Sequence, residues 1–371
     1  MQLNRLTLYN FKNLAPAELR FSGGINCFVG NNGEGKTNLL DAIHYLSFTR
    51  SHLRGTDAET VCHGETQMSL RGCYTADDGQ DLDLLLQYRC GERKTLTLNG
   101  KTYRRFSDHI GRIPLVLVTP IDQNLIDGQS EGRRKFLDSI ISQYNPTYLA
   151  SLIRYAKALD SRNALLRSES PIDDGLLTLY EEQMDKEAAL IYDCRRTMVE
   201  QFAPIFADVY ARLAPAREEV SISLLSHISD GSSLADQLHQ SRPKDQILGY
   251  TTRGPHRDDL QALLCGYPVR HEGSQGQRKT YALALRLAQY QYLFRQTALP
   301  TPLLLLDDIF ATLDPTRLSL LLQFVATSRF GQIFLTDTGA PALREILNSI
   351  PGNHLLFNVK QGIITPQVSS V

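Results

Sequence analysis

Residues 30–37 read GNNGEGKT and lie between two segments of different character. The run before them, INCFVG, is typical of a buried strand, and the run after them, NLLDAIHYLSF, has the spacing of a helix. The octapeptide fits the phosphate-loop pattern GxxxxGK[ST]. Its glycines let backbone N–H groups face phosphate oxygens, and the following helix directs its positive N-terminal end at the same anion. The sequence therefore predicts a nucleotide site, against the alternative of a glycine turn with an exposed lysine.

Two residues at the end of this loop have side-chain roles in that chemistry. We expect Lys36 to reach the β- and γ-phosphates of ATP and to act in catalysis, and Thr37 to bind Mg²⁺. The loop residues predicted to bind the nucleotide are Gly30, Asn31, Asn32, Gly33, Glu34, Gly35, Lys36 and Thr37.

A second motif, LLLLDD at 303–308, is four leucines that end in two acids. In a parallel sheet such a strand opens onto a site at its carboxyl end. We expect Asp307 to hold Mg²⁺ directly or through water, and Asp308 to orient or deprotonate the attacking water as the catalytic acid residue. Taken alone, the pattern also fits a solvated strand end; with the phosphate loop it indicates a nucleotide hydrolase.

The stretch SQGQ at 274–277 opens the long helical segment before LLLLDD. A serine cap, a glycine and free N–H groups at a helix start form a second anion site. Because the phosphate loop already serves one nucleotide, we expect Ser274, Gly276 and Gln277 to cap a nucleotide held by another copy of the chain. The alternative is an ordinary capped helix. ATLD at 311–314 follows Asp308 and is expected near the dimer seam.

Composition bounds the class of protein. The chain has 371 residues, of which 42% are hydrophobic and 21% charged, so it can bury a sizeable core. A net charge of −1 excludes a globally basic nucleic-acid-binding protein but leaves room for local basic patches. With no signal-peptide pattern and no apolar run of the roughly 18 residues that a spanning helix needs, we expect a cytoplasmic protein without a membrane partner. Six scattered cysteines without a CxxC pair are expected to be reduced structural thiols.

The chain changes character twice along its length. Residues 1–120 alternate strand candidates with turns, residues 130–215 have helical spacing, and strand and helix alternate again after about residue 245. A helix is predicted at 145–168, and hydrophobic residues seven apart from Leu177 to Ile205 predict a second one of roughly 35 residues, with Pro204 as a possible kink. The predicted domains are 1–125 and 246–371, which form one α/β head from both ends of the chain, and 126–245, an inserted helical arm.

Together these motifs resemble the ABC-type ATPase heads of the SMC and Rad50 group. The resemblance is closest to the RecF family, in LTLYNFKNL near the start, TPIDQNLIDGQSEGRRKFLD at 119–138, GPHRDDL at 254–260 and SQGQRK at 274–279. These matches keep their order over the whole chain, and the short arm fits RecF-like proteins better than those with long coiled coils. The resemblance implies a P-loop ABC-type head with a strand-rich N-terminal part and an inserted helical arm.

The resemblance also implies a function. RecF-like proteins bind ATP, dimerise around it and bind DNA in that state, at duplex next to a single-stranded gap. They work with RecR and RecO to help load RecA in gap repair, replication and the damage response. On this basis we expect a weak, DNA-stimulated ATPase that forms an ATP-dependent homodimer on single-stranded and double-stranded DNA. A glutamine-bearing loop is typical of the family, and Gln123 lies near its expected place.

Two departures from the wider ABC pattern point to slow hydrolysis. The residue after Asp307 is an aspartate and not the longer glutamate, and Thr336 to Thr338 stand where many ABC heads have a switch histidine. We therefore expect a turnover below roughly 1 s⁻¹, so that ATP acts as a clamp and its hydrolysis as a release. The alternatives are a transporter ATPase, which the helical arm disfavours, and a nuclease-coupled ATPase, for which no carboxylate-rich metal domain is visible. Candidate DNA contacts are Arg93-Lys94, Arg104-Arg105, Arg133-Arg134-Lys135 and Arg278-Lys279, although the third cluster also fits ion pairs within the arm.

Overall fold

The computed structural model describes most of the chain as two compact units. The described residues are 1–53, 55–168, 173–214, 218–228, 233–309, 313–327, 330–339 and 353–367. The first unit is Met1–Asp122, Val209–Arg217 and Lys279–Val371, and the second is Gln123–Asp208 and Glu218–Arg278. The first unit therefore draws on both ends of the chain, and the second on its middle.

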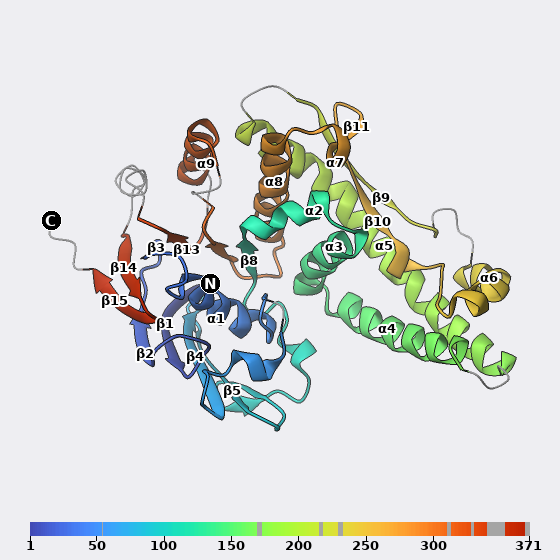
Figure 1. Ribbon diagram of the computed structural model, residues 1–371, viewed down its shortest axis with the longest axis horizontal. Helices are drawn as coiled ribbons and strands as arrows, with labels where there is room; N and C mark the ends of the chain where they lie inside the picture. Colours follow the sequence, from blue (N-terminus) through green and yellow to red (C-terminus); the bar gives the residue numbers. More distant parts are fainter. Residues whose placement is uncertain are drawn as a thin grey trace. The chain divides into compact units, whose positions relative to one another are not determined.

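A six-stranded sheet joins the two ends of the chain in the first unit (Figure 1). Its order is β15-β14-β3-β13-β12-β8, and all neighbours are parallel except β15 and β14. The strands are β3 Ile25–Val29, β8 Leu115–Val118, β12 Leu303–Leu306, β13 Ile333–Asp337, β14 Leu355–Lys360 and β15 Ile363–Gln367. Because β3 and β8 from the first part of the chain pair with β12, β13 and β14 from its last part, the predicted α/β head built from both ends of the chain is confirmed.

A second sheet of the same unit comes entirely from the N-terminal part. It is antiparallel, with the order β2-β1-β4-β5-β6-β7. The strands are β1 Gln2–Tyr9, β2 Ala17–Arg20, β4 Gln67–Thr75, β5 Asp81–Arg89, β6 Thr95–Leu98 and β7 Lys101–Thr102. One face is buried, as the fully buried Leu3, Leu6 and Leu70 show. This is the strand-rich lobe that the sequence predicts.

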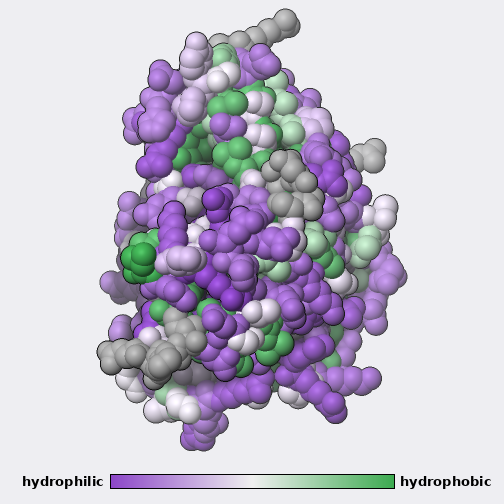
Figure 2. Space-filling model, turned by 90° about the vertical axis from the view of Figure 1, so that its right-hand side faces the viewer, coloured by the Kyte–Doolittle hydropathy of each residue, from purple (hydrophilic) through white to green (hydrophobic). Residues whose placement is uncertain are grey.

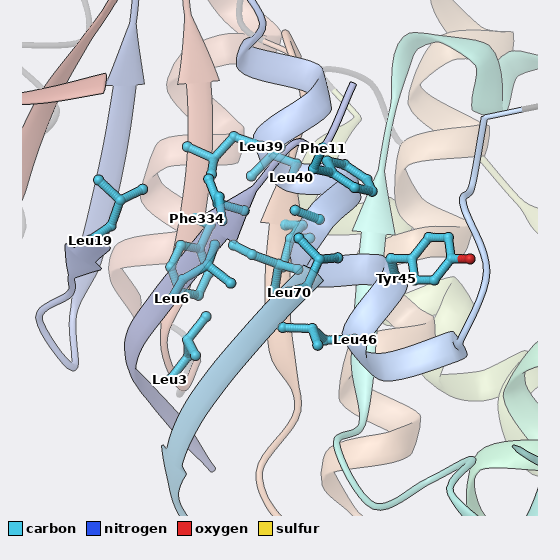
Figure 3. Close-up of a cluster of buried hydrophobic side chains, with 14 of the residues drawn as sticks. Leu3, Leu6, Phe11, Leu19, Leu39, Leu40, Tyr45, Leu46, Leu70 and Phe334 are labelled. Carbon is cyan, nitrogen blue, oxygen red and sulfur yellow. The ribbon is translucent and has the colours of Figure 1, made fainter. Parts of the chain in front are cut away.

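Helix α1, Lys36–Phe48, packs against both sheets. Most of its residues are buried, and Leu39, Leu40 and Leu46 are completely buried. Figure 3 shows these side chains directed at Leu6 of β1, Leu70 of β4 and Phe334 of β13. Burying one leucine side chain stabilises a fold by roughly 1.5–3 kcal/mol. The core therefore holds α1, and with it the phosphate-loop residues at its start, in a fixed position.

The second unit is mainly helical. Its helices include α2 Asn124–Asp127, α3 Ser130–Tyr144, α4 Pro146–Leu166, α6 Leu234–Leu248, α7 Val269–Glu272 and most of α5 Asp174–Leu213. A three-stranded antiparallel sheet, ordered β11-β10-β9, completes the unit with β9 Val220–Leu225, β10 Asp259–Leu264 and β11 Tyr267–Pro268. The face of the molecule in Figure 2 is largely hydrophilic, with hydrophobic side chains in separate areas.

The two long predicted helices are present and antiparallel. Helix α4 begins where Asn145 caps the backbone N–H of Tyr148 with its side chain, and α5 continues through Pro204 for 40 residues in all. The ion pairs Arg154–Glu187 and Arg162–Glu181 show the antiparallel register, because the partner number falls as the α4 number rises. The heptad residues are all buried: Leu177, Met184, Ile191, Met198 and Ile205.

Some expectations differ from the structure. The stretch GPHRDDL at 254–260, for which no helix or strand is predicted, contains a 3-10 turn at Pro255–Arg257 and the start of β10 at Asp259. The predicted arm boundary at residue 245 falls inside the second unit, since Asp245 and Thr251 both bind Arg162 of α4. These side-chain bonds join residues 246–278 to the helices. Part of the loop predicted at 167–175 lies outside the described residues.

Arg162 is a fully buried ion-pairing residue of this unit. Its guanidinium donates to Glu181 Oε1 at 2.9 Å, Asp245 Oδ2 at 2.8 Å and Thr251 Oγ1 at 2.8 Å. Glu181 is also paired with Arg242, so two acids face two guanidinium groups. A buried charge is tolerated only when it is paired in this way.

Replacing Arg162 with alanine should lower the free energy of unfolding of the second unit by about 3–5 kcal/mol, since it leaves buried carboxylates without their partner. The matched control is Arg196→Ala on α5, whose pairs with Asp193 and Glu200 are exposed, and it should cost at most about 1 kcal/mol. Urea denaturation followed by circular dichroism would measure both. Equal losses in the two variants would contradict the role given to Arg162.

Candidate nucleotide-binding site

The phosphate loop connects β3 to α1 and needs glycine at two of its positions. Gly35 has φ +108°, a conformation that other residues rarely adopt. At Gly30, a Cβ atom would lie 2.2 Å from the backbone oxygen of Val359 in β14. The loop therefore takes this path only because both residues lack a side chain.

Lys36 is folded over the loop that precedes it. Its Nζ donates to the backbone oxygens of Gly30 at 2.6 Å and Asn31 at 2.9 Å, and the residue is buried. An ammonium group has three N–H donors, so these bonds leave one for a ligand. Lys36 thus brings a positive charge to the concave side of the loop, where an anion such as a phosphate would be stabilised.

Three neighbouring parallel strands bring Thr37, Asp307 and Thr336 together. β13 lies between β3 and β12, and the residues after β3 and β12 meet at the carboxyl end of the sheet. Thr37 Oγ1 donates to Asp307 Oδ1 at 3.1 Å, and Thr336 Oγ1 donates to the same oxygen at 2.7 Å. Burial raises the pKa of Asp307 despite these two bonds. A cation beside this carboxylate would favour its charged form.

Asp308 has an unusual backbone and an unsatisfied side-chain atom. Its φ is +49°, in the left-handed region, and its N–H donates to Thr336 Oγ1 at 2.9 Å. Its buried Oδ1 has no hydrogen-bond partner among the residues that the structure describes. Strained backbone and unpaired buried polar atoms both carry a cost and occur often at functional sites. A metal-bound water or an attacking water would satisfy this oxygen.

The residues at this site supply the donors and acceptors that a magnesium–nucleotide complex needs. Oxygen ligands from Thr37 and Asp307 lie 3.1 Å apart, a spacing that suits two ligands of one Mg²⁺ with metal–oxygen distances of about 2.0–2.1 Å. The glycine-lined loop, the buried Lys36 and the unsatisfied oxygen of Asp308 supply the remaining contacts. The set of donors therefore fits the group.

Thr336 is a site residue whose role sequence reasoning missed. It stands where many ABC heads have a switch histidine, and its hydroxyl connects the two acids by donating to Asp307 and accepting from the Asp308 backbone. Its position at the end of a strand-like run, QIFLTDT, was the signal that could have indicated it. The contact joins residues 29 apart in the chain, so it depended on knowing the strand order.

Glu34 has a different environment from the rest of the loop. Its carboxylate accepts a hydrogen bond from the backbone N–H of Gln361, and its backbone oxygen accepts one from Gly362 at 2.9 Å. The turn between β14 and β15 therefore binds the loop. Because a carboxylate repels phosphate, this contact keeps the Glu34 side chain occupied while the loop backbone remains available. Asn31, Asn32 and Gly33 are exposed.

Ser274 and Gln277 form a reciprocal cap at the start of α8, Gln275–Phe294. The N–H of Ser274 donates to Gln277 Oε1 at 2.6 Å, and the N–H of Gln277 donates to Ser274 Oγ at 3.2 Å. Gln277 Nε2 also donates to Glu218 Oε1 at 2.8 Å. These residues and Gly276 belong to the second unit, so their contact with a nucleotide stays a prediction. The bonds that Ser274 and Gln277 make are those of an ordinary capped helix, which is the alternative.

The other predicted elements have local roles in the structure. Asp314 accepts from the backbone N–H of Arg317 at 3.0 Å at the start of helix α9, Pro315–Thr327, while Ala311 and Thr312 lie outside the described residues. Gln123 Nε2 donates to Asp127 at 2.7 Å. His256 Nδ1 lies 2.7 Å from the hydroxyl of Tyr155 in α4, within the second unit.

Several of the predicted DNA contacts are engaged within the protein. Arg133 makes a bidentate pair with Asp259, Lys94 pairs with Asp57 and Arg278 with Asp127. The alternative of ion pairs within the second unit therefore describes Arg133. Arg105 and Lys135 keep most of their surface exposed, at 77% and 71% of the side chain. These exposed cations are better placed to reach a phosphate backbone than Arg133 and Arg134, which are partly buried.

Known proteins resemble this chain over nearly its whole length. Residues 2–350 match the family model described as the RecF/RecN/SMC N terminal domain. The chain is 46% identical over 367 residues to the DNA replication and repair protein RecF of Porphyromonas gingivalis (strain ATCC 33277), covering 98% of this chain and 100% of that one. It is 44% identical to RecF of Bacteroides thetaiotaomicron, covering 98% of each. The chain belongs to the RecF family.

Solved structures agree with membership of the RecF family. The recombination mediator protein RecF in the RecFOR pathway, in its RecF-ATP form, superposes with a TM-score of 0.88 at 28% identity over 99% of this chain and 98% of that one. An Smc head bound to a domain of ScpA has a TM-score of 0.60 at 15% identity, which shows a shared fold alone; it covers 100% and 98% of the two chains. The predicted fold class of an ABC-type ATPase head is confirmed. Among the described helices, none is both long and apolar enough to cross a membrane.

The site geometry predicts that Thr336→Val lowers the free energy of unfolding of the first unit by about 1–3 kcal/mol. The variant leaves the buried Asp308 N–H without its acceptor and removes a donor from Asp307. Thr336→Ser keeps the hydroxyl and should lose clearly less. Thermal and urea unfolding of both variants would test this, and a valine variant as stable as the serine variant would show that the hydroxyl is not needed.

Proposed function

We propose that this chain is an ATP-dependent DNA-binding protein of replication and recombinational repair that dimerises when ATP binds. The observation that carries the proposal is the convergence of Lys36, Thr37 and Asp307 at the carboxyl ends of β3 and β12, the two strands that flank β13. Membership of the RecF family and the similarity to the RecF-ATP structure support it.

In this proposal the phosphate loop and Mg²⁺ hold the nucleotide together. Lys36 donates to the β- and γ-phosphates with the N–H that the loop carbonyls leave free, and the loop's N–H groups surround the phosphates. Thr37 and Asp307 hold Mg²⁺, which when bound neutralises phosphate charge. Thr336 keeps Asp307 in place through its hydroxyl.

Hydrolysis is expected to be slow because the side chain of Asp308 is short for a general base. Its side chain is one methylene shorter than a glutamate, and its backbone is held in the left-handed region by Thr336. A general base must lie within hydrogen-bond reach of the water that it deprotonates. Asp308 would orient that water through its unsatisfied Oδ1, with a turnover below roughly 1 s⁻¹.

Dimerisation explains the second anion-binding motif. In the proposed dimer, Ser274, Gly276 and Gln277 of one copy contact the γ-phosphate held by the other, so ATP completes the interface. Gln277 would then exchange its bond with Glu218 for one with the phosphate. The first unit would hold the nucleotide through its phosphate loop, and the second unit would supply Ser274, Gly276 and Gln277.

The proposed DNA substrate is duplex beside a single-stranded gap. Contacts from exposed cations to the phosphate backbone give binding that depends on salt and not on sequence. RecR and RecO are the proposed partners, and loading of RecA is the proposed outcome, since the similar solved structures belong to the RecFOR pathway.

Lys36→Met should abolish ATP binding and ATP-dependent dimerisation, because it removes the ammonium from the loop. Ser274→Arg should leave ATP binding by the monomer intact but block dimerisation by placing a bulky cation in the interface. Ser274→Ala is the matched control for the lost helix cap. Fluorescent-ATP titration and sedimentation velocity separate the two effects. Normal ATP-dependent dimers from both Lys36→Met and Ser274→Arg would contradict the shared site.

ATP should increase the affinity for a gapped duplex, and this binding should weaken steeply with salt. Fluorescence anisotropy with a labelled gapped duplex, with and without ATP and at several salt concentrations, measures both effects. A blunt duplex and a single strand serve as comparison ligands. If ATP binds and dimers form while DNA affinity is unchanged, the nucleotide site stands and the DNA-clamp function is wrong.

A further inference from the structure

Two imidazole rings and a carboxylate meet beside the phosphate-loop helix, after its catalytic start. Asp41 and His44 lie one turn apart on α1, and His52 lies in the segment that follows the helix. A ligand-capable atom from each of these three residues lies within 4.8 Å of one in each of the others. None of the three takes part in the proposed nucleotide chemistry.

Asp41 is a completely buried carboxylate that is held ionised. It accepts from Lys12 Nζ at 2.5 Å, Ser51 Oγ at 2.7 Å and His52 Nδ1 at 2.7 Å. The Lys12 ammonium lies against this buried carboxylate as its ion-pair partner. The carboxylate therefore fixes His52 from behind as a permanent hydrogen-bond acceptor.

The hydrogen bonds also fix which nitrogen of each ring can bind a ligand. His52 Nδ1 faces the Asp41 carboxylate, and His44 Nδ1 lies 3.1 Å from the backbone oxygen of Arg50. Both acceptors lack protons, so Nδ1 carries a hydrogen in each ring, and Nε2 is the atom that is left to coordinate a metal. His52 Nε2 is buried and has no hydrogen-bond partner among the described residues.

This arrangement has the form of a histidine metal site. Histidine ligands of metals almost always donate their other N–H to a carboxylate or a backbone carbonyl, and here one ring does each. The two ring centroids are 5.5 Å apart. Two imidazole ligands at about 2.0–2.1 Å from one metal lie at most about 4.2 Å apart. The ligand-capable atoms of this cluster lie within 4.8 Å of one another, close to that limit.

We infer that His44 and His52, with His52 oriented by Asp41, bind a divalent transition metal of the zinc class through their Nε2 atoms. Imidazole nitrogen suits Zn²⁺ and its neighbours, whereas Mg²⁺ prefers oxygen ligands. The metal site is thus chemically distinct from the site at Thr37 and Asp307. A bound metal would connect the third turn of α1 to the segment after it, and so stabilise the helix that carries Lys36.

The test is Zn²⁺ titration of the full chain by calorimetry, without nucleotide and with millimolar Mg²⁺ present to occupy oxygen-ligand sites. One Zn²⁺ per chain is expected, and Co²⁺ in its place should give the absorption bands of nitrogen ligation. His44→Phe keeps the ring stack on Phe48, whose centroid is 4.6 Å from that of His44, but removes the ligand nitrogen, and His52→Gln removes the other. Each should weaken Zn²⁺ binding at least tenfold.

His63→Ala is the matched control, since His63 is exposed and lies outside the cluster. It should bind Zn²⁺ as the unaltered chain does. If His52→Gln fails to fold by circular dichroism, His44→Phe decides the question alone. The inference is overturned if the unaltered chain binds no Zn²⁺ under these conditions, or if His44→Phe binds it as tightly as the unaltered chain.

Discussion

The packing of α1 against two sheets is the constraint on which the rest of the first unit depends. The helix begins with Lys36 and Thr37, whose side chains need positions accurate to a few tenths of an ångström, and it continues with Leu39, Leu40 and Leu46 in the core. Because these leucines are fully buried, the helix can neither rotate nor slide without opening cavities. Each cavity would cost several kcal/mol. The apolar half of α1 therefore sets the geometry of its polar start. Helix propensity alone would not do this, since a 13-residue helix is marginal in isolation.

The parallel sheet supplies the second half of the site by strand order. Asp307 and Thr336 come from strands late in the chain, yet they meet Thr37 because β13 lies between β12 and β3. The two units differ in how they use buried polar groups. In the first, Thr336 joins two acids at a site where one oxygen of Asp308 remains unsatisfied. In the second, Arg162 and Arg195 are buried with paired acids, an arrangement that defines which helices pack together more than it adds stability.

Sequence reasoning reached the features that are local in the chain. GNNGEGKT and LLLLDD are contiguous, and the heptad spacing from Leu177 to Ile205 falls on one face of one helix, so periodicity was sufficient. The sheet β9-β10-β11 was missed because its strands are short and its central strand follows a polar turn at GPHRDD. The contact of Thr336 with Asp307 and the cluster at Asp41 depend on pairings between distant segments, which spacing cannot show. Residues 246–278 were assigned to the head for the same reason, because bonds such as that of Thr251 to Arg162 in α4 join segments that are far apart in the sequence.

The hydrogen bonds that the predicted phosphate contacts already make bear on how ATP could act in this protein. Lys36 is already held by two loop carbonyls, and Gln277 by Ser274 and Glu218, so both predicted phosphate contacts have partners without a nucleotide. Binding therefore exchanges hydrogen bonds and does not create all of them, and the net gain for each is small. Lys36 retains a free donor and needs little change, whereas Gln277 must give up a charge-assisted bond. ATP binding by one chain should then be the easier step, and closure on a second chain the harder one. Such an order suits a clamp whose assembly waits for a further source of binding energy, which a phosphate backbone held by exposed cations would provide.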